Sequence, residues 1–209
     1  MTRQVFLLLD ALVLLLWLTA CEQIAYQQMN DPDRDSRQQP AAVMQALHIT
    51  PGAHVADLGA GGGYFTFFLA AAVGPEGKVY AVDTEEASLR FIEKDAAQRG
   101  GMPRQVELIL ATPKDPHLPL HGVDLIFTCN TYHHLSDRVA YMKSLGRYLR
   151  PNGRIAIIDF KEGGWLPSFL GHATSKDSVR QELEAAGYRL INDFDFLSKQ
   201  HFQVFSPNP

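Results

Sequence analysis

The chain has 209 residues, of which 46% are hydrophobic and 20% are charged. This composition is ordinary for a folded protein, and the length suits one domain with a sizeable core plus an appendage. The formal net charge of -4 at pH 7 argues against a nucleic-acid partner bound over a broad basic surface. Two cysteines, Cys21 and Cys129, are too few for a disulfide framework or a cysteine-based zinc site.

The first 20 residues are predicted to be a signal peptide outside the fold. Arg3 precedes a nearly continuous apolar run of 14 residues from Val5 to Leu18, and Leu18-Thr-Ala-Cys21 closes it. The run is shorter than the ~20 residues that span a bilayer, which disfavours an uncleaved membrane anchor. Its ending resembles the lipobox of bacterial lipoproteins. That resemblance implies lipidation at Cys21 and a chain held at the bacterial cell membrane by acyl groups.

A second start of translation at Met29 is the alternative, and it would make the protein cytoplasmic. Residues 21–40 are polar and are predicted to form a linker, either a tether or a loosely packed cover. The folded domain is then expected to span residues 41–209.

From residue 40 onward, short apolar strands alternate with helical segments. The expected helices cover residues 40–47, 64–73, 85–99 and 137–149, and the expected strands cover 55–57, 78–83, 106–110, 123–129 and 154–159. A helix beginning near Thr174 and ending at Gly187 follows, and then two strands, at 188–197 and 201–205, around a short turn. This order predicts an α/β fold: a doubly wound, mostly parallel sheet that ends in an antiparallel hairpin.

The segment from His54 to Gly63 is the strongest signal in the chain. A short apolar strand leads to Asp57, and glycines then occupy positions 59, 61, 62 and 63 before the helix expected from Tyr64. Glycine adopts backbone angles that other residues avoid and lets a ligand approach the main chain closely. Free N–H groups at the helix start, with the positive end of the helix dipole, are expected to offer an anion site.

A second acid, Asp83, ends the next strand twenty residues after Gly63. In a doubly wound sheet, a carboxylate at that spacing meets ribose hydroxyls. The dinucleotide fingerprint G-x-G-x-x-G needs a glycine where Tyr64 stands, which weakens the alternative of a nicotinamide-dependent oxidoreductase. The pattern present, D-x-G-x-G-x-G, resembles motif I of the class I S-adenosylmethionine (SAM) dependent methyltransferases. The resemblance covers roughly residues 41–206.

The resemblance implies a cofactor, SAM, and the residues that hold it. Gly59, Ala60, Gly61 and Gly63 would bind the methionine carboxylate, and Asp57 would favour its ammonium group. Asp83 would accept both ribose hydroxyls, with Thr84 beside it. Asp115 stands where the family commonly carries an acid for the adenine amino group, although a turn acid in a proline-rich loop is nearly as good an interpretation.

Asn130 ends the fourth strand, where this fold opens to its crevice and where the family places the methyl group and its acceptor. Tyr132-His133-His134-Leu135 resembles an element of some small-molecule methyltransferases, including relatives of the quinone-biosynthesis C-methyltransferases. A histidine there could take a proton from a hydroxyl, amine or activated carbon. Adjacent histidines do not face one point, so at most one of His133 and His134 is catalytic. The two histidines are not expected to form a metal site, because the sequence offers no third ligand at a recognisable spacing from them.

The sequence therefore predicts a SAM-dependent methyltransferase acting on an unidentified small or lipophilic acceptor, anchored to a membrane by a lipidated N-terminus. The competing hypothesis is a membrane-anchored binding protein that retains a SAM-shaped pocket without catalysis.

Overall fold

The computed structural model describes residues 33–161 and 173–209. The predicted signal segment, Cys21 and Met29 lie outside these residues. Within the two described ranges, no helix combines the length and the apolar character needed to cross a membrane.

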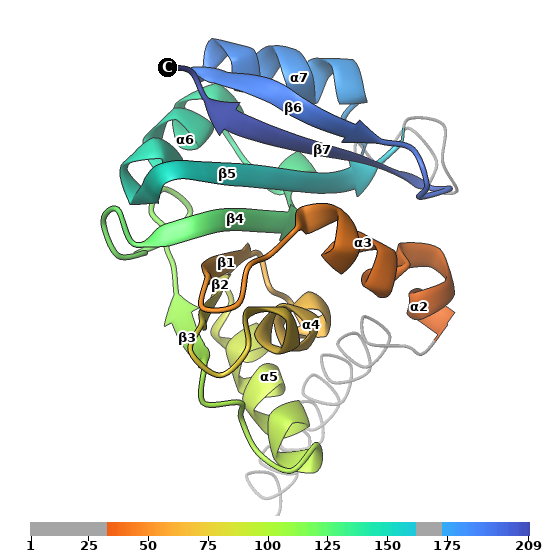
Figure 1. The fold of residues 1–209 in the computed structure, drawn as a ribbon, viewed down its shortest axis with the longest axis vertical. Coiled ribbons are helices and arrows are strands. Elements are labelled where there is room, and N and C mark those ends of the chain that lie inside the picture. The colour runs from red at the N-terminus through yellow and green to blue at the C-terminus, as the bar shows by residue number, and fades with distance from the viewer. Residues whose placement is uncertain (1–32, 162–172) are drawn as a thin grey trace, which may run out of the picture.

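The described residues form a seven-stranded sheet in the order β3-β2-β1-β4-β5-β7-β6. Strands β1 to β5 run parallel, and β7 is antiparallel to both of its neighbours, β5 and β6 (Figure 1). The mostly parallel sheet with a terminal antiparallel hairpin is confirmed. The strands are β1 (His54–Leu58), β2 (Lys78–Asp83), β3 (Val106–Leu110), β4 (Val123–Cys129), β5 (Leu149–Phe160), β6 (Tyr188–Phe194) and β7 (Gln200–Pro207).

Helices cover both faces of the sheet. One face packs against α3, α4 and α5, and the opposite face packs against α6 and α7. Alternate residues of the central strands divide between the two cores, since successive side chains of a strand point to opposite faces. The helices are α2 (Asp33–Gln38), α3 (Pro40–Leu47), α4 (Tyr64–Val73), α5 (Glu86–Gln98), α6 (Arg138–Leu145) and α7 (Lys176–Ala185), with 3-10 turns η1 (Tyr132–His134) and η2 (Gly146–Tyr148).

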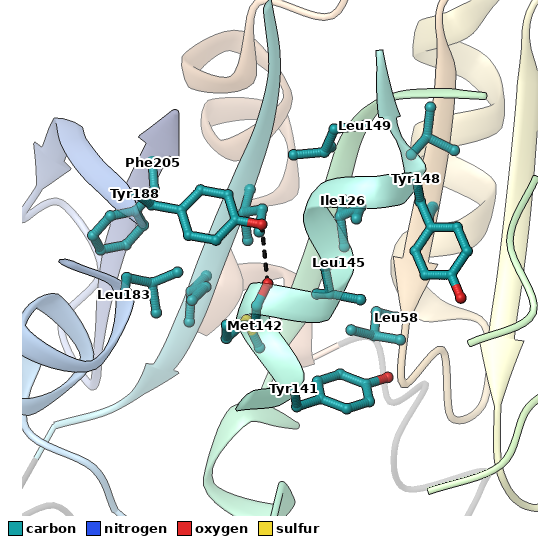
Figure 2. Close-up of a cluster of buried hydrophobic side chains, with 14 of the residues drawn as sticks. Leu58, Ile126, Tyr141, Met142, Leu145, Tyr148, Leu149, Leu183, Tyr188 and Phe205 are labelled. Carbon is teal, nitrogen blue, oxygen red and sulfur yellow. Dashed lines mark hydrogen bonds between the residues drawn. The ribbon is translucent and has the colours of Figure 1, made fainter. Parts of the chain in front are cut away.

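The core beneath α6 and α7 is the largest of the three buried clusters of the described residues (Figure 2). Met142 and Leu145 of α6 are fully buried in this cluster, which also contains Tyr188 of β6. The hydroxyl of Tyr188 donates to the carbonyl oxygen of Met142 at 2.9 Å, so this buried phenol has a partner. The contact ties α6 to the first strand of the terminal hairpin.

Residues 33–40 differ from the expected polar linker, because they are helical and make specific contacts. The guanidinium of Arg34 lies 4.1 Å from the centre of the Tyr64 ring, and the Tyr64 hydroxyl donates to Asp35. Gln38 is buried and accepts from the thiol of Cys129. Polar composition predicts exposure only when no partner is near, and these partners lie far away in the sequence.

The carboxyl ends of the parallel strands meet along one edge of the sheet. The glycine turn follows β1, Asp83 ends β2, and Asn130 follows β4. Strand β7 runs the other way, so Gln200, its first residue, reaches the same edge. Ligands bind at this edge in open α/β sheets.

Candidate active site

The glycine turn is held to the end of β2 by backbone hydrogen bonds. The amides of Gly59 and Ala60 both donate to the carbonyl oxygen of Val82, at 2.8 and 3.0 Å. The amide of Gly63 donates to the Ala60 carbonyl, and that of Gly61 donates to the Asp83 carboxylate at 2.8 Å. The sequence suggested that these amides are free to bind an anion. In the structure they are not free, because each of them donates to a partner within the protein. The open donors are those of the first turn of α4, which has no side-chain cap.

Two features require glycine at position 59: the backbone angle there and the close approach of a side chain from across the edge. Its φ angle is +75°, and a Cβ placed there would overlap the side chain of Thr131. The Thr131 hydroxyl donates to the Gly59 carbonyl at 3.3 Å. The turn after β1 and the turn after β4 are thus in direct contact.

Asp57 lies beneath the turn, 3% exposed, and accepts from the hydroxyl of Thr66 in α4 at 2.6 Å. Burial raises the pKa of Asp57 to about 6, although the Thr66 hydrogen bond and the charge of Arg34 oppose this shift. A carboxylate with so little contact with solvent is stabilised in its charged form by a nearby cation.

Asp83 combines a structural role with spare hydrogen-bonding capacity. One oxygen accepts from the amide of Gly61 and the other from the amide of Glu85, at 2.9 Å. A carboxylate offers about four acceptor positions, so two remain for ribose hydroxyls. Thr84 is exposed beside it. The buried acid, the second acid and the uncapped helix match the ammonium, the ribose and the carboxylate of SAM, so the residues fit this cofactor.

Asp115 belongs to a different network. Its carboxylate accepts from the Tyr148 hydroxyl at 2.7 Å, from Arg147 at 3.1 Å and from the amide of His117 at 2.7 Å. These bonds, the amide of His117 first, lower the pKa of Asp115. Its contacts are those of a turn acid, and they do not include the glycine turn.

Asn130 connects β4 to the hairpin. Its backbone is left-handed, with φ +57°, and its amide donates to the carbonyl oxygen of Ile158. Its side-chain oxygen accepts from the amide of Gln200 at 2.6 Å. Cys129, just before it, is buried, and burial raises the pKa of its thiol to about 12, so it stays protonated.

The two adjacent histidines have different environments. The side chain of His133 is 4% exposed, and its Nδ1 lies 2.7 Å from a carboxylate oxygen of Asp159. The other oxygen of Asp159 accepts from the His133 backbone amide at 3.0 Å. His134 is exposed, with its ring centre 4.1 Å from that of His133.

Neighbouring contacts hold the turn that carries His133. Tyr132, the first residue of η1, is fully buried, and its hydroxyl donates to Glu182 of α7. Arg138 also donates to Glu182 through two nitrogens, at 2.7 Å each. Among the described residues, no group of three or more histidine, cysteine and acidic side chains could hold a metal ion.

Residues 49–200 match the model of a methyltransferase domain family. The chain belongs to this family. A crystal structure of a SAM-dependent methyltransferase from Aquifex aeolicus superposes with a TM-score of 0.81 at 26% identity, over 89% of this chain and 98% of that one. The domain is therefore of the SAM-dependent methyltransferase class, and the predicted fold and cofactor are confirmed.

The curated relatives that this chain matches are methyltransferases of greater length. A malonyl-acyl-carrier-protein O-methyltransferase from Methylococcus capsulatus is 32% identical over 68% of this chain and 54% of its own length. A phosphoethanolamine N-methyltransferase from Zea mays is 28% identical over 71% of this chain and 29% of its own. The methyltransferase domain thus corresponds to about half or less of these relatives.

Three residues of this edge were not predicted as site residues: Thr131, Asp159 and Gln200. Asp159 carried a usable signal, because it lies near the end of a buried parallel strand and so at the ligand edge. Thr131 and Gln200 carried none, since their roles depend on contacts with Gly59 and Asn130 across the fold.

Proposed function

We propose that this protein transfers the methyl group of SAM to a small or lipophilic acceptor. The observation that carries the proposal is the meeting of two sets of groups at one edge of the sheet. The glycine turn with Asp57 and Asp83 forms one set, and the paired His133 and Asp159 form the other.

The first set would hold the cofactor. Asp57 would favour the ammonium group, Asp83 the ribose hydroxyls, and the first turn of α4 the carboxylate. When bound, SAM supplies a methyl carbon made electrophilic by the sulfonium. The protein then has to align the acceptor and exclude water.

The second set would prepare the acceptor. An ionised carboxylate only accepts hydrogen bonds, so Asp159 selects the tautomer of His133 with its proton on Nδ1. In the neutral ring, Nε2 is then the basic nitrogen. His133 is thereby suited to take a proton from a hydroxyl, an amine or an activated carbon as it is methylated.

The glycine turn with Asp57 and Asp83 is the cofactor half of the site, and titration calorimetry tests it. The Asp83→Asn variant is expected to bind SAM roughly 10- to 100-fold more weakly, because hydrogen bonds to a charged group contribute about 1.5–3 kcal/mol. Asp115→Asn is the matched control and is expected to bind within about twofold of the wild type, since the contacts of Asp115 lie in another network. Equal retention of SAM by Asp83→Asn and the wild type would contradict the proposal.

The paired His133 and Asp159 are the acceptor half of the site, and a turnover measurement tests it. Protein incubated with methyl-labelled SAM and a small-molecule extract of the cells that make it should yield a labelled product. SAM binding without any labelled product would favour the non-catalytic binding protein instead.

We also propose that Cys21 is lipidated and holds the domain at a bacterial membrane. The support is the sequence Leu18-Thr-Ala-Cys21 at the end of an apolar run. Mass spectrometry of the native protein would then show a chain beginning at Cys21 with acyl groups attached. An intact, unmodified chain from the cytosol, or one beginning at Met29, would contradict this.

A further inference from the structure

Helix α2 lies against two parts of the ligand edge. The hydroxyl of Tyr64, the first residue of α4, donates to Asp35. The thiol of Cys129, the last residue of β4, donates to Gln38 at 3.2 Å. Figure 1 shows α2 on the side of the sheet toward which β5 points. The helix is therefore attached to the edge at which the cofactor is proposed to bind.

Arg34 of this helix lies at the start of α4. The central carbon of its guanidinium is 4.1 Å from the centre of the Tyr64 ring and 5.9 Å from the centre of the Phe65 ring. Both rings belong to the first turn of α4, which begins directly after Gly63. The charged end of Arg34 is thus beside the end of the glycine turn.

The charge of Arg34 also acts on buried groups at the ends of β1 and β4. Burial raises the pKa of Asp57 and the pKa of the Cys129 thiol, and the positive charge of Arg34 opposes both rises. A charge stabilises the ionised form of another group in this way only at short range. Arg34 therefore lies close to Asp57, the acid proposed to take the ammonium group of SAM.

The two residues together match the amino-acid end of SAM. Its ammonium and its carboxylate are attached to the same carbon atom, so the groups that bind them have to be neighbours. Asp57 is negative and buried, and Arg34 brings a positive charge to the same place. The contact of a guanidinium with a ring face uses none of its five N–H donors, and those donors bind a carboxylate in pairs.

We propose that Arg34 binds the carboxylate of SAM, alongside the first turn of α4. The inference rests on the proposed function in that the ligand is the cofactor. Arg34 precedes residues 49–200, the part of the chain that matches the methyltransferase family model. Helix α2 then belongs to the cofactor site, and the matched domain without it is an incomplete binding unit.

The test compares SAM with decarboxylated SAM, which lacks the carboxylate but keeps the ammonium, the sulfonium and the ribose. In titration calorimetry on the full chain, Arg34→Gln is expected to bind SAM roughly 10- to 100-fold more weakly than the wild type, because a charge-assisted pair of hydrogen bonds is lost. The variant should bind decarboxylated SAM no more weakly than the wild type does. A merely structural role of Arg34 would weaken the binding of both ligands.

Arg37→Gln is the matched control, because it removes the same charge from an exposed position of the same helix. It is expected to bind each ligand within about twofold of the wild type, since an exposed charge contributes little.

A second measurement uses only the wild type. Trypsin cleaves after arginine, and cleavage after Arg34 and Arg37 requires α2 to open locally. A ligand that binds Arg34 opposes this opening, so saturating SAM should slow cleavage at these two sites by roughly tenfold or more. Saturating decarboxylated SAM should slow it by less than about twofold, because it offers Arg34 no carboxylate.

Three results would overturn the proposal: unchanged SAM binding by Arg34→Gln, an equal loss of binding for both ligands in that variant, or equal protection from trypsin by both ligands. Calorimetry of the wild type separates this proposal from the proposed function. Wild type that does not bind SAM refutes the proposed function itself. Wild type that binds SAM, with Arg34→Gln unchanged, refutes only the role of Arg34.

Discussion

The two halves of the ligand edge treat their buried polar groups in opposite ways. At β1 and β2, the glycine-turn amides and the carboxylates of Asp57 and Asp83 have partners within the protein. At β4 and β7, among the described residues, Thr128, His201 and Gln203 keep an unpaired atom. In the first half the polar groups bond to one another, whereas in the second half three buried polar atoms of the described residues have no partner.

Both halves store an unfavourable free energy, but in different forms. Asp57 carries a charge into a buried place, and the β4 and β7 residues carry neutral groups without partners. The cost of the first depends on pH and that of the second does not. The following variants distinguish the two forms.

The largest effect is expected at His133. His133→Asn removes the ring that Asp159 orients through Nδ1, and with it the basic Nε2, so methyl transfer should fall by about 10²- to 10⁴-fold. SAM affinity should stay within about twofold, because the ring does not belong to the cofactor half. Label transfer from methyl-labelled SAM measures the rate, and calorimetry measures the affinity. The control is His134→Asn at the exposed neighbour. A greater loss of methyl transfer in that variant would show that His134, and not His133, takes the proton.

Asp57→Asn is expected to stabilise the fold while it weakens SAM binding. The folded pKa of about 6 lies above the ordinary 3.8, so the folded state binds the proton more tightly than the unfolded state. Stability contributed at this site is present below pH 4 and is lost as pH rises to 6. The variant should therefore match the wild type at low pH and exceed it by about 3 kcal/mol above pH 6.

Urea unfolding of the Asp57→Asn variant and the wild type across this pH range measures the difference. A constant difference, independent of pH, would show that Asp57 is not the buried charge of the cofactor half.

Gly59→Ala should destabilise the contact between the two halves. The left-handed backbone and the overlap with Thr131 together are expected to cost roughly 2–3 kcal/mol. Gly52→Ala is matched in backbone, with φ +83° and no atom near the added Cβ, so it should cost only about 1 kcal/mol. Denaturant unfolding compares them. Equal costs would mean that Thr131 yields freely and that the turns are not coupled.

The smallest effect is expected from Thr128→Val. Replacing an unpaired buried hydroxyl with a methyl group of the same shape should raise the free energy of unfolding by about 1 kcal/mol. The rise should be the same at pH 5 and pH 8, unlike that of Asp57→Asn. A loss of stability on calorimetric or urea unfolding would show that this hydroxyl has a partner in solution.

By itself, the sequence determined most of the secondary structure, although it did not predict the helix at 33–38 and it placed the end of α6 and the start of β5 too late. It also marked the residues that are proposed to bind the cofactor. The expected bounds of α4, β2, β3 and β4 agree with the structure residue for residue, because alternating apolar runs and glycine turns act over short range. Asp57, the glycines and Asp83 were proposed as cofactor residues in the same way, since their spacing lies within one strand-turn-helix-strand unit.

Only the tertiary structure decided the acceptor half. It joined His133 to Asp159, Asn130 to Gln200 and the helix at 33–38 to Tyr64, and it placed Asp115 in a separate network. These partners are separated by 26 to 70 residues, and only the order of strands in the sheet brings them together. No local pattern records which strands become neighbours, so these contacts had to be read from the fold.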